Sequence, residues 1–261
     1  MRSDFAVVSL GKARMRGGWR VTTLGARPFH QLLWITRGQG RITVGGITRG
    51  YSANRAIFVP AGTLMSIELG AQVNGLILDI PPDPQLGLPT DTFNLRVADM
   101  TAQAQLTSYI EQIERELSSK SIGFDRMLRG YMLLLSTWIE RQLNGQDVAV
   151  LRDRSHQLVE RYARLIQEDF RSGLSVADFA ARLGVTPTHL SRVCKDASGR
   201  PAHALLQDRI MHEARRLLAD TDMPAREVAE HLGFSSAAYF TRAFSQQTRL
   251  TPSQFRSNPE R

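Results

Sequence analysis

A short helical unit occurs twice in the last third of the chain. The first copy contains LGVTPTHLSRVCK at residues 183–195, and the second contains LGFSSAAYFTRAFS at residues 232–245. The glycines of the two copies are 49 positions apart, whereas Arg192 and Arg242 are 50 positions apart, so the second turn holds one extra residue. Each copy predicts a helix, a glycine turn and a second helix, which is the outline of a helix-turn-helix.

Local chemistry favours this outline in both copies. Gly184 and Gly233 accept the backbone angles of a tight turn. Thr186, followed by Pro187 at the favoured first helical position, and Ser236 are suited to cap the second helix. The second helix is therefore expected to begin directly after each cap.

The second helix of each copy has an apolar face and a polar face. The apolar positions are Leu190, Val193 and Cys194 in the first copy, and Phe240, Ala243 and Phe244 in the second. The polar positions are Thr188, Ser191, Arg192 and Lys195 in the first copy, and Ala237, Ala238, Thr241, Arg242 and Ser245 in the second. Such short, slightly basic faces fit a DNA major groove, where arginine holds a guanine edge and threonine or alanine contacts a thymine methyl group. Ordinary solvated surface is the alternative, but two independent solvated faces have no reason to match.

The segment between the two units predicts a rigid spacer helix over residues 201–218. At 1.5 Å per residue this helix is about 27 Å long. That length is of the same order as the roughly 34 Å of one turn of DNA. One chain can therefore place two second helices in successive major-groove segments.

The run from Ser175 to Arg256 resembles the DNA-binding domain of AraC/XylS-type transcriptional regulators. Its second half, VAEHLGFSSAAYFTRAFSQQTRLTPSQFR, carries the family signature nearly whole. The resemblance implies double-stranded DNA and RNA polymerase as partners, and it implies backbone amides near phosphates at the two helix caps. Together with the polar faces, it makes the candidate DNA-contacting residues Thr186, Thr188, Ser191, Arg192, Lys195, Ser236, Ala237, Ala238, Thr241 and Arg242.

Four positions depart from the family pattern, and one of them is Pro201, which stands one place earlier than expected. Cys194 stands where the family usually has phenylalanine, and Leu205 stands where it has tyrosine, which predicts a smaller core in the first unit. Arg249 replaces the usual glycine before Leu250. Either a left-handed backbone there carries strain, or the helix ends differently.

Short segments punctuated by glycine and proline fill residues 5–80. WRVTTL, HQLLWIT, GRITVGG, AIFVP, LMSIEL and VNGLILDI predict strands of a small antiparallel barrel or sandwich. PPDPQLGLP at residues 81–89 then ends regular structure, because closely spaced prolines remove backbone donors. The rhythm of HQLLWITRGQGRITVGG and YSANRAIFVPAGT resembles the cupin-type sensor barrel that is common in the same family.

Two amphipathic helices are expected next, over residues 106–117 and 127–139, since apolar residues recur there at three- and four-residue intervals. They bury their apolar stripes either against a second copy of the chain or against the barrel. The predicted chain is thus α+β, with an N-terminal cupin-like β-barrel, a helical dimerisation pair and a C-terminal all-α domain of two helix-turn-helix units. The boundaries we expect are 1–98 for the sensor barrel, 99–145 for the helical pair, 146–154 for a linker and 155–261 for the DNA-binding domain.

The histidines of the front half argue against a metal-dependent cupin enzyme, which needs several of them beside a carboxylate. Residues 1–150 contain His30 alone, and Met65 stands where the barrel pattern would place a ligand. We therefore predict no catalytic residue, metal or cofactor, and a barrel that binds a small molecule. The candidate lining residues are Trp19, His30, Trp34, Arg37, Phe58 and Met65, with plain core packing as the alternative for each.

The net charge of +8 is concentrated at the front of the chain. Residues 1–60 hold ten basic side chains against one acid, Asp4. This excess indicates an anionic effector, with Arg16, Arg37 or Arg55 as its partners; a solvated basic surface is the alternative.

The predicted compartment is a reducing cytoplasm, because the chain has a single cysteine and neither a membrane span nor a secretory signal. The predicted function is a homodimeric, sequence-specific transcriptional regulator controlled by a small-molecule effector of unknown identity. A ligand-independent regulator whose barrel serves only dimerisation is the alternative.

Overall fold

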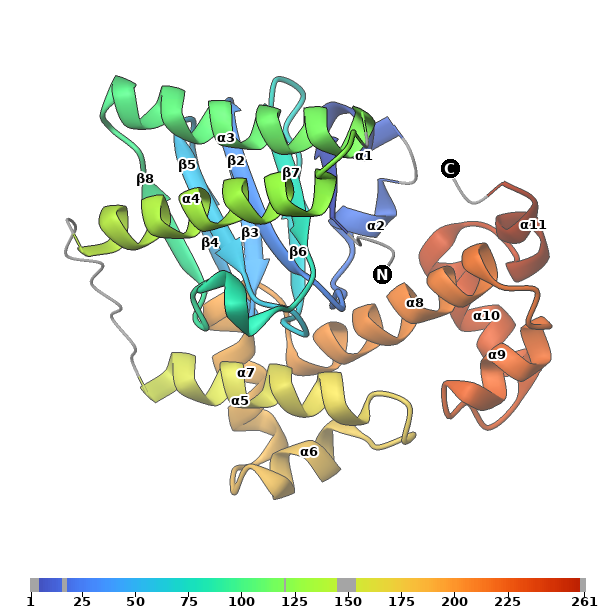
Figure 1. Ribbon diagram of the computed structural model, residues 1–261. Coiled ribbons are helices and arrows are strands. Elements are labelled where there is room, and N and C mark those ends of the chain that lie inside the picture. Colours follow the sequence, from blue (N-terminus) through green and yellow to red (C-terminus); the bar gives the residue numbers. More distant parts are fainter. Residues whose placement is uncertain (1–4, 16–17, 120, 145–153, 259–261) are drawn as a thin grey trace.

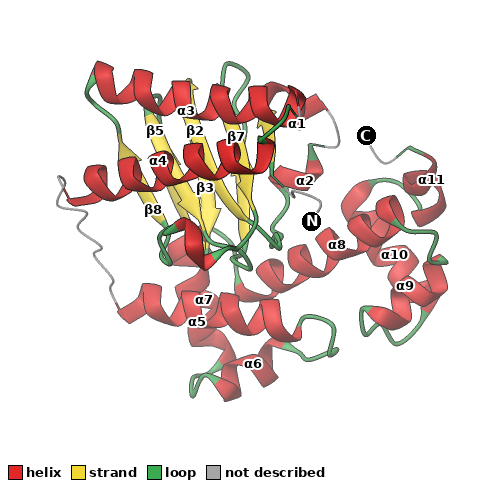
Figure 2. Ribbon diagram, viewed as in Figure 1, coloured by secondary structure: helices red, strands yellow, loops and turns green. Residues whose placement is uncertain are grey.

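The computed structural model describes residues 5–15, 18–119, 121–144 and 154–258, and Figure 1 shows their arrangement. All the described strands lie before residue 97 and are followed by two helices up to residue 144, and every described element from residue 154 onward is a helix (Figure 2). The linker expected over residues 146–154 lies outside the described residues except for its last one, which begins helix α5.

The first part of the chain contains both sheets. Its strands are β1 (Ala6–Ser9), β2 (His30–Arg37), β3 (Gly40–Val44), β4 (Ile47–Tyr51), β5 (Arg55–Val59), β6 (Met65–Glu68), β7 (Asn74–Ile80) and β8 (Phe93–Arg96). Its helices are α1 (Leu10–Met15), α2 (Trp19–Thr22), the 3-10 turn η1 (Pro84–Leu86), α3 (Met100–Ser119) and α4 (Phe124–Asn144). The second part contains α5 (Arg154–Asp169), α6 (Val176–Arg182), α7 (Pro187–Ser198), α8 (Ala202–Asp220), α9 (Ala225–His231), α10 (Ala237–Thr248) and α11 (Pro252–Ser257).

The strands form two antiparallel sheets. Sheet A has the order β1-β7-β2-β5-β8, and sheet B has the order β4-β3-β6. The central strand β2 is buried along residues 31–35, because both faces of sheet A are covered. A strand covered on both faces reads as a continuous apolar run instead of an alternating one, which explains the segment LLWI.

The cupin-like barrel is not confirmed, because the two sheets do not close on each other. A barrel requires a continuous ladder of hydrogen bonds around its circumference. Within the described residues no hydrogen-bonded strand pair joins the edge strands β4 and β8. The antiparallel sandwich, which the same strand pattern allows, is what forms.

The prediction of a strand over residues 19–24 was wrong, because the first four of them form α2. The ring of Trp19 packs edge-on against His212, with centroids 5.5 Å apart, and against Phe255 at 5.8 Å. Helical backbone brings this aromatic residue onto the C-terminal helices, where it is buried. A strand would instead have alternated its side chains across a sheet.

Two apolar cores lie on either side of sheet A. One fills the space between the sheets, and the other lies between sheet A and the antiparallel pair α3 and α4, which covers its outer face (Figure 1). Leu106, Ile110 and Ile113 of α3 and Leu135 of α4 are fully buried there. The helical pair therefore packs within its own chain, while Met127, Leu133 and Leu134 of α4 remain exposed.

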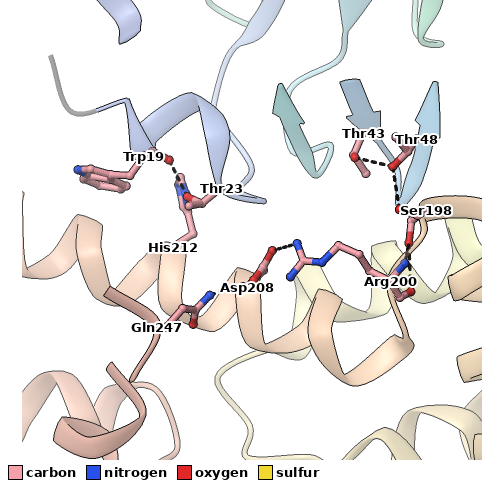
Figure 3. Close-up of polar contacts among 9 residues, drawn as sticks. All are labelled: Trp19, Thr23, Thr43, Thr48, Ser198, Arg200, Asp208, His212 and Gln247. Carbon is pink, nitrogen blue, oxygen red and sulfur yellow. Dashed lines mark hydrogen bonds and ion pairs between the residues drawn. The ribbon is translucent and has the colours of Figure 1, made fainter. Parts of the chain in front are cut away.

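A third core joins the two parts of the chain. It includes Trp19 and Ile47 from the first part together with most of the buried residues of the helices after residue 154. At its edge the hydroxyl of Thr23 lies 2.8 Å from Nδ1 of His212 on α8 (Figure 3). Burial lowers the pKa of His212 well below its usual value, so a neutral imidazole occupies this contact.

Candidate nucleic-acid interface

Two helix-turn-helix units follow α5, and their elements have matching lengths. α6 and α9 each contain seven residues, and α7 and α10 each contain twelve. α9 begins 49 residues after α6, whereas α10 begins 50 residues after α7. The extra residue therefore lies in the second turn, as the sequence predicts, and we call α7 and α10 the recognition helices.

The turn and the cap of each unit have the same geometry. Gly184 and Gly233 have φ angles of 71° and 76°, a left-handed conformation that glycine adopts without steric cost. The hydroxyls of Thr186 and Ser236 each accept a hydrogen bond at 3.2 Å from the backbone amide three residues later. Both recognition helices therefore start from the same N-cap arrangement.

The apolar faces of the recognition helices are buried in a single core. Its members from these helices are Leu190, Val193 and Cys194 of α7, and Phe240, Ala243 and Phe244 of α10. Burial raises the pKa of the Cys194 thiol to about 12, which keeps it neutral. Fully buried Tyr162 of α5 belongs to the same core, and its hydroxyl donates a hydrogen bond to the carbonyl of Ala202 at 2.9 Å.

The polar faces of the recognition helices are open to solvent, and no other described segment covers them. The exposed candidates are Thr186, Thr188, Arg192, Lys195, Ser236, Ala238 and Arg242, and the half-buried ones are Ser191, Ala237 and Thr241. At the offset of 50 the burial classes agree at most positions of the two helices, including the two arginines. They differ at Pro187 and Lys195, which are exposed where Ala237 and Ser245 are half-buried. The guanidinium of Arg192 lies 3.3 Å from Nδ1 of His189, which is on the same face of α7.

α8 is the spacer between the units and contains 19 residues. It is about 28 Å long at 1.5 Å per residue, of the same order as the roughly 34 Å of one DNA turn. In Figure 1 it runs from the cluster of α5, α6 and α7 to the cluster of α9, α10 and α11.

A buried ion network holds α8 in place. Glu213 accepts hydrogen bonds from Arg171 at 2.8 Å, Arg209 at 3.1 Å and Arg216 at 2.8 Å. Glu213 and Arg209 are each 3% exposed, and the Arg209 guanidinium lies 3.8 Å from the centroid of the Phe170 ring. Burial alone would raise the pKa of Glu213, but the hydrogen bond from Arg216 and the neighbouring guanidinium charges outweigh it and lower the pKa to about 2.

The two recognition helices differ in the residue that ends them. The C-cap residue that follows α7 is Gly199, with φ of 75°, and the one that follows α10 is Arg249, with φ of 64°. The left-handed conformation costs an L-residue roughly 1–2 kcal/mol. The strain that the sequence predicts at Arg249 is therefore present, and the helix does not end in a different way.

Replacing Arg249 with glycine should raise the free energy of unfolding by about 0.5–1 kcal/mol, because relief of strain exceeds the added entropy of the unfolded chain. Gly199→Arg is the matched control. A Cβ there meets no described atom within 4 Å, so its cost of about 1 kcal/mol comes from the backbone alone. Urea unfolding followed by circular dichroism measures both, and a destabilised Arg249→Gly variant would contradict the assignment of strain.

The residues predicted to line an effector site do not converge. Trp34 and Phe58 belong to the core between sheet A and the helical pair, whereas Met65 belongs to the core between the sheets. Trp19 packs against α8 and α11. These four side chains fill cores, which is the alternative that the sequence left open for each.

The polar candidates are also scattered. Nδ1 of His30 accepts a hydrogen bond from the backbone amide of Ala61 at 3.1 Å, and burial lowers the pKa of His30. Arg37 is exposed at the end of β2. Arg16 lies outside the described residues, and Arg55 lines the pocket described next.

An open pocket of about 690 Å³ lies at the unclosed edge between the sheets, and α5 forms one of its walls. Its charged lining residues are Arg49, Arg55, Asp91, Arg96, Glu160 and Arg164. Nε of Arg55 and Nδ1 of His156 are buried without a hydrogen-bond partner among the described residues. Sequence reasoning found Arg55 but missed Arg49, Arg96 and Arg164, because the four arginines of the pocket come from four separate segments, β4, β5, β8 and α5.

This geometry defines a protein class: a DNA-binding protein with two helix-turn-helix units on one chain. Comparison with known proteins agrees, since the sequence profile of a helix-turn-helix domain matches residues 179–258. The probable transcription factor PqrA of Proteus vulgaris is 35% identical over 86 residues, which are 33% of this chain and 70% of that protein. The chain belongs to the AraC/XylS family of transcriptional regulators.

Two further similarities cover more of the chain. The arabinose operon regulatory protein of Salmonella typhimurium is 27% identical over 135 residues, which are 50% of this chain and 48% of that protein. A crystal structure of an apo ToxT variant from Vibrio cholerae matches 98% of both chains at 13% identity with a TM-score of 0.47.

Among the described residues, no helix is both long and apolar enough to cross a membrane.

Proposed function

We propose that the two recognition helices read successive major-groove segments on one side of a duplex, and that residues 155–261 form the domain that does so. The observation that carries the proposal is the pair of polar faces with the same N-cap hydrogen bond and an exposed arginine at the same position. Arg192 and Arg242 hold guanine edges, and the short side chains around them contact neighbouring bases. The capped helix starts at Thr186 and Ser236 direct free backbone amides toward phosphates.

Selection of duplexes from a random-sequence library by the full-length protein tests this proposal. We expect enriched sequences with two short preferred blocks whose centres are about 10 base pairs apart. Binding to the enriched duplex should weaken steeply with salt, because lysine and arginine contacts release counterions from the phosphates. Enrichment of a single block would contradict the two-segment proposal.

The pocket supports a second part of the proposal, control by a small anionic effector. Arginines outnumber acids in its lining by four to two, counted among the described residues, and the orphaned Nε of Arg55 is a donor without a partner there. Strands of the first part and α5 of the second part share its walls. A molecule bound there contacts both parts, so it has different affinities for different arrangements of them and shifts their populations.

Thermal unfolding with benzoate and hexanoate, compared with their primary amides, tests the effector. A ligand at a hundred times its Kd stabilises a protein by about 2.7 kcal/mol, so we expect carboxylates to raise Tm by several degrees and amides to have little effect. Arg55→Ala with Arg164→Ala should remove the difference. Arg37→Ala, at an exposed arginine outside the pocket, should preserve it. Equal shifts from acids and amides would argue against an anion site.

The alternative is a ligand-independent regulator whose first part serves only dimerisation. Exposed Met127, Leu133 and Leu134 on α4 support a homodimer with or without an effector. If no probe shifts Tm and the protein sediments as a dimer, this alternative is favoured.

A further inference from the structure

One buried carboxylate on the spacer helix joins the two helix-turn-helix units. Asp208 lies on α8 and is 7% exposed. Its Oδ2 accepts a hydrogen bond from Arg200, in the turn directly after α7, and its Oδ1 accepts one from Nε2 of Gln247 at 3.0 Å (Figure 3). Gln247 lies in the last turn of α10. A single side chain therefore contacts the C-terminal ends of both recognition helices.

Two arginines, Arg200 and Arg215, lie near this carboxylate. The hydrogen bond to Asp208 raises the pKa of Arg200. Arg215, one of the buried residues of α8, also feels the negative charge of Asp208, although burial lowers its pKa. Oε1 of Gln247 is buried without a partner among the described residues, so its amide makes its one hydrogen bond there to Asp208.

The α7 side of this contact is fixed to the first part of the chain. The hydroxyl of Ser198 accepts from the backbone amide of Arg200 at 3.2 Å, and the carbonyl of Ser198 accepts from the Thr48 hydroxyl on β4 at 3.3 Å. Thr48 also bonds Thr43 on β3 at 2.7 Å. The turn that contains Arg200, the partner of Asp208, is thereby attached to sheet B, as Figure 3 shows.

The second unit also approaches the segment between α5 and α6 closely, at Gly233. A Cβ at Gly233 would lie 2.7 Å from the carbonyl oxygen of Arg171 and 2.8 Å from the amide of Gly173. This contact lies at the turn of the second unit, whereas Gln247 meets Asp208 of α8 at the far end of α10. At that end of α10 the bond from Gln247 to Asp208 holds the helix to α8, in addition to the packing of its apolar face in the core.

We propose that Asp208 is a positioning residue that sets the separation and relative rotation of the two recognition helices, and with them the base-pair spacing that the protein accepts. The inference rests on the proposed reading of two groove segments. Each added base pair moves the second segment by about 3.4 Å and turns it by roughly 36°, a tenth of a turn. Two recognition helices held at a fixed separation and rotation bind less tightly when a base pair is added or removed, whereas helices that can move relative to each other tolerate the altered spacing.

The experiment uses full-length protein and the duplex enriched by the wild type, together with versions that carry one base pair more or one fewer between the two blocks. We expect the wild type to prefer its own spacing by about tenfold. In Asp208→Ala and in Gln247→Ala this preference should shrink about fivefold, which corresponds to roughly 1 kcal/mol, while each block alone is bound as before. Gln246→Ala, at the exposed neighbour of Gln247, should retain the wild-type preference.

A rescue distinguishes positioning from general loosening. Gln247→Glu places a second carboxylate against Asp208 and should weaken the spacing preference, and adding Asp208→Asn should restore part of it by renewing a hydrogen bond. If Asp208→Ala fails to fold, as shown by circular dichroism, the Gln247 variants carry the test. Wild-type spacing profiles in all the variants would overturn the role of Asp208. A wild-type protein without any spacing preference would instead contradict the two-segment proposal itself.

Discussion

Replacing Arg192 and Arg242 together with alanine is expected to weaken binding to the preferred duplex by about 2–6 kcal/mol, or about 30-fold to 10⁴-fold. Each arginine that holds a guanine edge is worth about 1–3 kcal/mol, and losses at well-separated positions add. The two side chains lie on different recognition helices, at equivalent exposed positions. Fluorescence anisotropy at fixed salt measures the affinity of each single variant and of the double variant.

The matched control removes the same charge elsewhere. Arg115 and Arg126 are exposed on α3 and α4, away from the recognition helices, so their double alanine variant should bind the preferred duplex about as well as the wild type. Affinity for an unrelated duplex should fall less than about threefold in either double variant, since base contacts add little to non-specific binding. Equal losses on preferred and unrelated duplexes would show that Arg192 and Arg242 contact phosphates.

Replacing Glu213 with glutamine is expected to lower the free energy of unfolding by about 3–5 kcal/mol, because it leaves the buried guanidinium of Arg209 without an opposite charge. Arg209 keeps a hydrogen bond to Gln167 at 2.8 Å and its contact with Phe170, but neither supplies a negative charge. Urea unfolding measures the loss. The paired change Arg209→Met with Glu213→Leu should recover most of it, since a buried ion pair can be exchanged for apolar packing at little cost.

The same residue makes the stability depend on pH in one direction. The pKa of Glu213 is about 2 in the folded protein and near 4.5 in an ordinary environment. Its contribution is therefore complete above about pH 4.5 and is lost as the pH falls toward 2. The wild type should lose more stability than Glu213→Gln over this window, and parallel curves for the two proteins would contradict the charge assignment.

Local signals account for the part of the candidate site that the sequence predicts well. The caps Thr186 and Ser236, the two turn glycines and the apolar stripes all act within one turn of helix, so they remain valid whatever surrounds them. The extra residue of the second turn followed from the same local comparison, which left the left-handed backbone observed at Arg249 as one of two alternatives.

Long-range contacts explain what the sequence did not predict. Trp19 reads as the start of a strand, yet its helical turn is decided by His212 and Phe255, about two hundred residues later. The hydrogen bond between Asp208 and Gln247 joins positions 39 residues apart, and no local sequence pattern predicts it. The sequence spacing of Glu213 from Arg209 and Arg216 predicts ion pairs along one helix, but the burial of Glu213 depends on the rest of the fold.

The most direct measurement for the two-segment account is guanine methylation interference on the enriched duplex, with wild-type protein, Arg192→Ala and Arg242→Ala. Methylation at N7 blocks the major-groove edge that arginine holds. We expect the wild type to show two interfering blocks about one turn apart on one face of the duplex, and each variant to lose interference in one block, a different block for each arginine. Loss in the same block for both variants, or interference that neither variant changes, would contradict the account.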